Sequence, residues 1–196
     1  MARQRDTRSR MVHSAVEVLR ERGVGGVTID AVLARSGAPR GSVYHHFPGG
    51  RAEIVSEALK FAGDAIGEIV DRGAVDGYSE ALRQFVDLWR NILEGSDYSA
   101  GCPVVAVAVG PVEESPELFA DAASIFERWR TTLATGIARE GLSSTTAQHL
   151  ATMSIAAVEG AVILCRAQRS SEPLDEVVQQ LEVLFDSQRL LARMTR

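Results

Sequence analysis

Apolar side chains recur at helical spacing along nearly the whole chain, and no stretch alternates apolar and polar residues as a β-strand would. The segment from Thr7 to about Arg22, for example, places Met11, Ala15 and Val18 on one face, and Gly23 follows its end. The pattern predicts an all-α fold. The expected helices cover residues 7–22, 28–36, 39–46, 51–71, 78–93, 116–139, 145–168 and 173–193, with a short kinked helix within 102–112.

Two of the short helices are joined by a glycine-containing turn. Thr28 is a good N-cap residue and Asp30 falls in the first turn, while Gly37 ends the first helix and Pro39 suits the start of the second. This spacing is typical of a helix-turn-helix, in which the second helix enters the major groove of DNA. On that helix Arg40 is placed either to read guanine or to bind phosphate.

The charge distribution favours the same end of the chain as a site for a polyanion. The net charge is −5, yet residues 1–51 hold nine arginines and only four acidic residues. A basic end on an acidic body is typical of a nucleic-acid-binding protein, although a charge block can also be solvated surface. The sign changes near residue 50, so we expect a DNA-binding domain over residues 1–50 and a second helical domain over residues 51–196.

The helix-turn-helix stretch resembles one family closely. The run from Thr28 to Phe47, with its G-A-P-R-G-S-V-Y-H-H-F ending, is similar to the N-terminal region of the Tet repressor family. Leu33 and the Gly49-Gly50 pair depart from the usual pattern. The resemblance implies an N-terminal three-helix DNA-binding domain followed by a larger helical domain for ligand binding and dimerisation. It also implies a sequence-specific transcriptional regulator, most often a repressor that a small lipophilic effector releases from its operator.

The family pattern also implies roles for individual residues of the DNA-binding domain. By this resemblance four residues face the bases and four contact phosphates. The base-facing residues are Pro39, Arg40, Gly41 and Ser42, and the phosphate-contacting residues are Thr28, Tyr44, His45 and Arg51. The adjacent histidines 45 and 46 project to different helix faces, so we expect no metal site there.

The second domain offers candidates for an effector pocket. The segments G-C-P-V-V-A-V-A at 101–108 and E-G-A at 159–161 are similar to a branch of the family that includes repressors of drug-efflux and redox-enzyme genes. Apolar chambers with few polar groups hold lipophilic molecules, although the same side chains can simply form the core. The expected lining is Phe85, Trp89, Cys102, Val105, Val109, Phe126, Trp129 and Met153.

Small residues near the end of the chain indicate a close helix contact. Glu159 lies in that apolar stretch and either binds a cationic ligand or pairs with Arg166 on the same face, and we favour the pair. With the last helix, the small residues are expected to form a four-helix interface of a homodimer, which requires an inverted-repeat operator. The expected interface residues are Ala157, Gly160, Ala161, Leu181, Leu184 and Phe185.

Other classes of protein find little support in the sequence. It contains no H-E-x-x-H, P-loop, G-x-S-x-G or C-x-x-C motif, so we expect neither an enzyme nor a bound cofactor. Two cysteines are too few for a disulfide framework, and Cys102 in apolar surroundings favours an inert thiol. No signal peptide or membrane helix is expected, so the expected location is the cytoplasm. A DNA-packaging protein without an effector remains the rival hypothesis.

Overall fold

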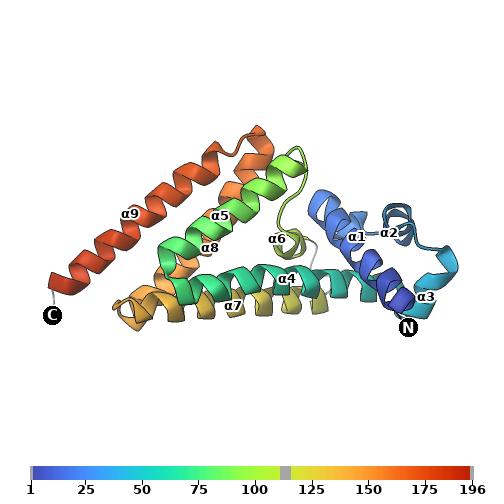
Figure 1. Cartoon of the computed structure of the whole chain (residues 1–196), viewed down its shortest axis with the longest axis horizontal. Helices are drawn as coiled ribbons and strands as arrows, with labels where there is room; N and C mark the ends of the chain where they lie inside the picture. Colours follow the sequence, from blue (N-terminus) through green and yellow to red (C-terminus); the bar gives the residue numbers. More distant parts are fainter. Residues whose placement is uncertain (1, 111–115, 195–196) are drawn as a thin grey trace. The chain divides into compact units, whose positions relative to one another are not determined.

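All regular structure in the described residues is helical, which confirms the predicted all-α class. The computed structural model describes residues 2–110 and 116–194 (Figure 1). The last part of the expected helix over 102–112 therefore lies outside the described residues. The elements are α1 (Ala2–Gly26), α2 (Ile29–Ser36), the 3₁₀ turn η1 (Arg40–Ser42), α3 (Val43–His46), α4 (Gly50–Asp76), α5 (Tyr78–Gly95), α6 (Pro103–Ala108), α7 (Pro116–Arg139), α8 (Ser144–Gln168) and α9 (Glu172–Met194).

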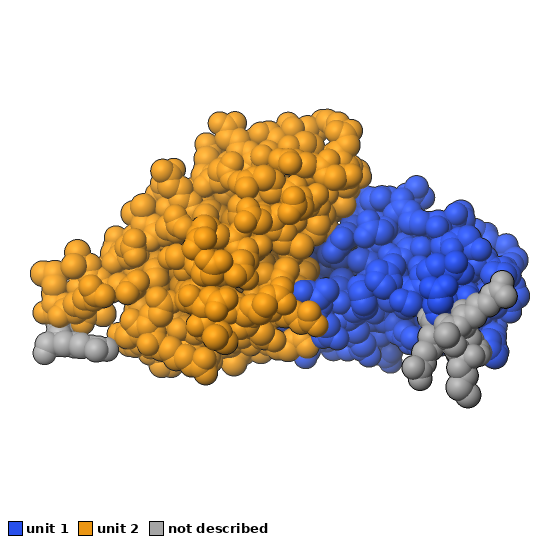
Figure 2. All heavy atoms as spheres, in the orientation of Figure 1, with its two compact units in different colours: residues 1–65, 102–125 blue, residues 66–101, 126–196 orange. Residues whose placement is uncertain are grey.

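The chain divides into two compact units, which are coloured separately in Figure 2. Unit 1 comprises residues 1–65 and 102–125, and unit 2 comprises residues 66–101 and 126–196. The division falls inside α4 rather than at residue 50, where the charge changes sign. The reason is packing within unit 1: Glu57 of α4 pairs with Arg8 of α1, and the ring of Phe61 lies 4.5 Å from that of His13.

The predicted start and stop signals of α2 operate as the sequence indicated. The hydroxyl oxygen of Thr28 accepts a hydrogen bond from the Ala31 N–H at 3.1 Å and caps the helix. At the other end Gly37 adopts a left-handed conformation with φ 64°, and its N–H donates to the Leu33 carbonyl. These caps hold α2 against α1, whose residues Met11 and Leu19 are fully buried.

In unit 2, α8 packs against both α9 and α5. It has the length and mean hydropathy, 1.6, of a membrane-spanning helix, and it is the single described helix that does. Its buried side includes Leu150, Val158 and Val162, which contribute to the core of the unit. The apolarity of α8 is therefore accounted for in part by a core position among its neighbouring helices.

A buried hydrogen-bonded pair joins α5 to α8. The hydroxyl oxygens of Tyr78 and Ser154 are 2.6 Å apart, and the Ser154 hydroxyl donates to the Leu150 carbonyl at 2.7 Å. Because Ser154 has one hydroxyl hydrogen, the Tyr78 O–H is the donor to Ser154. Burial raises the pKa of Tyr78 to about 12, so the phenol stays protonated as this pair requires.

This pair predicts an asymmetric response to mutation. Ser154→Ala leaves the buried Tyr78 hydroxyl without its acceptor and should cost about 1–3 kcal/mol of unfolding free energy. Tyr78→Phe removes the donor while Ser154 keeps its bond to Leu150, so we expect a smaller loss, about 0.5–1.5 kcal/mol. Urea unfolding at one protein concentration measures both. The double variant should resemble Tyr78→Phe, and a Ser154→Ala variant as stable as wild type would contradict the assignment.

Candidate nucleic-acid interface and ligand cavity

The helix-turn-helix presents a small polar surface on a buried apolar support. Val43 and Phe47 are almost completely buried, which directs one side of η1 and α3 inward. Tyr44 is 66% exposed although it is aromatic. The residues four apart on a helix share a face, so the inward position of Val43 and Phe47 turns the intervening residues outward. The exposed members of the predicted DNA-binding set are Thr28, Pro39, Arg40, Gly41, Tyr44, His45 and Arg51.

Two residues expected at the bases have partners within the protein. Nη1 of Arg40 donates to Oδ1 of Asp30 at 2.6 Å, and both side chains are largely exposed. That bond uses one of the five guanidinium hydrogens, so the fork for guanine remains available. Ser42 is half-buried, and its hydroxyl donates to the Pro39 carbonyl at 2.6 Å. Ser42 therefore shapes the 3₁₀ turn in this structure.

The guanidinium of Arg51 lies on backbone carbonyls. Its Nε donates to the Val27 carbonyl at 2.7 Å and its Nη2 donates to the Val24 carbonyl at 2.6 Å. These two bonds join the first turn of α4 to the end of α1 and to the residue that follows it. The phosphate contact of Arg51 stays a prediction. Sequence patterns could not reveal the two carbonyl bonds, because backbone carbonyls carry no residue-type signal.

Several other arginines of the basic end also have internal partners. Arg35 makes a two-bond ion pair with Glu21, at 2.9 and 2.8 Å, which joins α2 to α1. The hydrogen bond to Glu21 raises the pKa of Arg35 further above its ordinary value. Arg8 and Arg20 pair with glutamates as well. The positive charge available to DNA is consequently smaller than the arginine count alone indicated.

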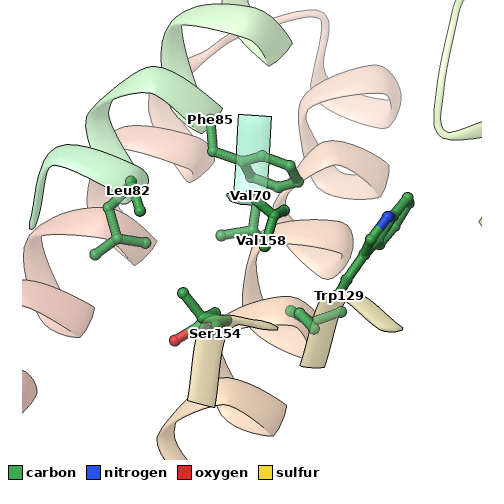
Figure 3. A pocket seen from close by; sticks show the side chains of 9 residues that line it. Val70, Leu82, Phe85, Trp129, Ser154 and Val158 are labelled. Carbon is green, nitrogen blue, oxygen red and sulfur yellow. The ribbon is translucent and has the colours of Figure 1, made fainter. Parts of the chain in front are cut away.

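Unit 2 encloses an apolar cavity between α4, α5, α7 and α8. Its volume is about 40 Å³. Figure 3 shows Phe85 from α5 and Trp129 from α7 among the surrounding side chains. Ser154 contributes the hydroxyl that already bonds to Tyr78. The lining residues are Val70, Ala81, Leu82, Phe85, Trp129, Leu133, Ser154, Ile155 and Val158.

Only part of the expected lining reaches this cavity. Phe85 and Trp129 line it, whereas Trp89 is fully buried behind Phe85, with ring centroids 6.2 Å apart. Phe126 is half-buried and packs edge-on against Trp129. Met153 is 50% exposed, because it precedes the inward-facing Ser154 by one residue and so points to another side of α8.

The remaining expected lining residues belong to unit 1. Cys102 is buried, Val105 is half-buried in α6, and Val109 is 74% exposed just beyond the end of α6. The apolar character of Cys102 and Val105 is accounted for by unit 1, where α6 packs on α1. Sequence reasoning missed the α4 and α8 contributions, which the isolated polar Ser154 in an apolar helix could have indicated.

The expected dimer residues also separate into two groups. Ala161, Leu181 and Phe185 are buried inside the protomer, and Phe185 packs on Tyr78 with centroids 4.4 Å apart. These three side chains are therefore not on the surface of the protomer where a partner could contact them. The half-buried members are Ala157, Gly160 and Leu184. A different set of apolar side chains on α8 and α9 is exposed: Met153, Ile163, Leu164, Val183, Leu190, Leu191 and Met194.

Arg166, the favoured partner of Glu159, contacts a backbone carbonyl. Nη2 of Arg166 donates to the Ser99 carbonyl at 2.8 Å, so this side chain supports the loop after α5. Glu159 is 6% exposed within α8. The sequence placed both residues on one face correctly, but it could not show that a loop carbonyl lies within reach of the arginine.

Both cysteines, Cys102 and Cys165, are buried. Burial raises the pKa of the Cys165 thiol, which disfavours the reactive thiolate. In residues 2–110 and 116–194, no three His, Cys, Asp or Glu side chains are grouped so as to hold a metal ion.

Comparison with known proteins decides the family. A family model described as bacterial regulatory proteins of the tetR family matches residues 12–58. A second, described as the C-terminal domain of LmrA/YxaF-like transcriptional regulators, matches residues 79–180. The chain belongs to the TetR family. It is therefore a DNA-binding transcriptional regulator and not an enzyme, as the sequence resemblance implied.

Relatives and a solved structure agree along nearly the full length. An HTH-type transcriptional regulator of Mycobacterium tuberculosis is 38% identical over 183 residues, which cover 91% of this chain and 93% of the relative. The HTH-type transcriptional repressor DhaR of Mycobacterium sp. strain GP1 is 26% identical over 92% of this chain and 91% of its own. The crystal structure of a TetR transcriptional regulator from Chloroflexus aurantiacus gives a TM-score of 0.78 at 25% identity, covering 96% and 98% of the two chains.

The exposed guanidinium of Arg40 predicts a change in base preference. Arg40→Ala should weaken operator binding and relax the preference at one or two base pairs of each half-site, by about 1–3 kcal/mol. Competition among duplexes with single base-pair changes measures this. Arg40→Lys keeps the charge without the planar fork and should behave like Arg40→Ala at those base pairs. Uniform weakening by Arg40→Ala, with recovery by Arg40→Lys, would instead make Arg40 a phosphate contact.

Proposed function

We propose that this TetR-family regulator is a cytoplasmic homodimeric repressor that binds an inverted-repeat operator and is released by a small lipophilic effector. The apolar cavity of unit 2 carries the proposal, because its lining combines two aromatic rings with aliphatic side chains from four helices. The relative DhaR, named as a repressor, supports the direction of regulation.

The proposed DNA contacts follow from exposure in the helix-turn-helix. Arg40 reads a base edge together with the Pro39 ring and the backbone of Gly41, and Tyr44 and His45 contact phosphates. Thr28 contacts a phosphate at the start of α2, where the helix N-terminus favours an anion. Ser42 acts by shaping the turn through its bond to the Pro39 carbonyl.

The cavity constrains the chemistry of the effector. Drug-sized ligands occupy pockets of about 300–1,000 Å³, so the effector must move lining side chains to enter a cavity of about 40 Å³. The lining offers no charged side chain, which favours an uncharged molecule. Behind Phe85, the fully buried indole N–H of Trp89 has no acceptor among the described residues. An effector with one hydrogen-bond acceptor beside an aromatic or aliphatic body would suit both features.

The proposed dimer uses the exposed apolar surface of α8 and α9. Seven exposed apolar side chains on two helices that pack together favour a partner that covers them, and two-fold symmetry supplies a second copy of the same surface. A Cβ added to Gly160 would meet no atom within 4 Å in the protomer, so the space beside this residue is open to a neighbouring helix.

The dimer predicts a specific sensitivity at Gly160. Gly160→Asp should convert the protein to a monomer, because a charge at a packed helix interface would be buried without a partner. Sedimentation velocity at micromolar concentration measures the state. Ala123→Asp, at an exposed alanine of α7, is the control and should stay dimeric. A dimeric Gly160→Asp variant, or a monomeric wild type, would contradict the proposed interface.

Induction predicts reciprocal coupling between effector and operator. An effector that lowers operator affinity tenfold must bind the operator complex ten times more weakly, a coupling of about 1.4 kcal/mol. The operator is first selected from random duplexes with the wild-type protein. A lipophilic library is then titrated with and without that duplex, by fluorescence of Trp89 and Trp129. If the protein selects no sequence from the random duplexes, the result would favour a DNA-packaging protein. Equal affinities in both titrations would exclude that ligand as an inducer.

A further inference from the structure

Arg51, in the first turn of α4, is bonded to the end of a different helix. Its Nε and Nη2 donate to the carbonyls of Val27 and Val24 at 2.7 and 2.6 Å. Regular helix geometry breaks at Gly23, whose φ is 68°, so these carbonyls lie where α1 is ending. The Val24 carbonyl also accepts the Val27 N–H at 3.2 Å in this turn. A carbonyl oxygen can accept two hydrogen bonds, and a planar guanidinium is suited to hold two carbonyls at once.

The electrostatics of the two helix ends favour this placement. An arginine in the first turn of α4 faces the positive end of that helix dipole, which is unfavourable. The carbonyl oxygens at the end of α1 carry partial negative charge, which attracts the same cation. The attraction to the end of α1 therefore offsets the unfavourable interaction of the guanidinium with the α4 dipole.

The bonds of Arg51 and of its neighbour Gly50 fix two points of the helix-turn-helix. Val27 directly precedes Thr28, the N-cap of α2. The neighbour of Arg51, Gly50, donates its N–H to the Phe47 carbonyl at 2.9 Å and so ties the start of α4 to the end of α3. Through Gly50 and Arg51 together, the first turn of α4 holds both the start of α2 and the end of α3.

We infer that Arg51 is a positioning residue for DNA reading, which fixes the α1–α2 turn to the start of α4, and that it is not a phosphate ligand. The inference rests on the proposed operator binding. It differs from the contact implied by the family pattern, in which the basic residue after the helix-turn-helix meets the DNA backbone. Arg51 instead acts through the backbone that orients Thr28 and α2.

Arg51→Lys separates the two roles, because lysine keeps the charge and loses the planar fork. We expect Arg51→Lys and Arg51→Gln each to lower affinity for the selected operator roughly tenfold, as the loss of charge-assisted hydrogen bonds allows. Affinity for a scrambled duplex and the slope of log affinity against log salt should stay as in wild type. Amide hydrogen exchange at residues 24–31 should be faster in both variants.

The control is Arg35→Lys, the same substitution at an arginine whose partner is the Glu21 carboxylate, with which lysine can still pair. It should retain operator affinity and slow exchange at residues 24–31. Melting temperatures establish that each variant is folded at the assay temperature, and Arg51→Lys alone suffices if Arg51→Gln does not fold.

Three results would overturn the inference. Wild-type affinity in Arg51→Lys, with a salt slope reduced by about 0.9 in Arg51→Gln, would make Arg51 a phosphate ligand. A lower melting temperature with unchanged operator affinity would leave it a purely stabilising residue. Unchanged exchange at residues 24–31 would remove the clamp itself. Failure of the wild type to select any sequence would count against the proposed function alone, since the exchange measurement needs no DNA.

Discussion

The DNA-reading segment depends on the burial of two side chains. The segment from Arg40 to His46 is a 3₁₀ turn followed by a four-residue α-helix. Isolated helices shorter than about 12–15 residues are marginal in water, so this one cannot hold its own shape. Burial of Val43 and Phe47 in unit 1 supplies what the local sequence lacks. The same burial decides which side chains remain outside for DNA.

That constraint explains how the arginines of the basic end divide between two tasks. Arg35 joins α2 to α1 through Glu21, and Arg51 holds the α1–α2 turn through two carbonyls. Each bond fixes a support of the short reading segment, and each removes a cation from the pool that could contact phosphate. Arg40 and its partner Asp30 are both largely exposed, so the guanidinium of Arg40 is available for the proposed base contact. Part of the basic composition therefore stabilises the fold of unit 1, and only the rest is available to bind DNA.

Local chemistry made much of this fold predictable, and side-chain directions did not follow as easily. The Thr28 cap and the Gly37 stop operate where the sequence placed them, because capping depends on neighbouring residues alone. In α8, however, apolar and small residues surround the helix, so periodicity cannot tell which side faces inward. For that reason the sequence pattern predicts Ala161 at a dimer surface and Met153 in a cavity, whereas Ala161 is buried in the protomer and Met153 is exposed. Likewise, the sequence pattern predicts Cys102 and Val109 in the cavity lining, because apolar residues occur in both compact units and do not reveal to which unit a segment belongs.

The small size of the cavity bears directly on how the proposed switch could work. A ligand shifts a conformational equilibrium only by the difference between its affinities for the two states. A molecule that fitted the space beside Phe85 and Trp129 without displacing anything would bind this state well and would not favour another. An effector too large for about 40 Å³ must prefer a state in which side chains of the four lining helices have moved apart. Val70 places α4 among those helices, and Arg51 of the same helix holds the α1–α2 turn. The proposed induction thus requires that this tightly packed state is the one that binds the operator, so that an effector favouring a different state lowers operator affinity.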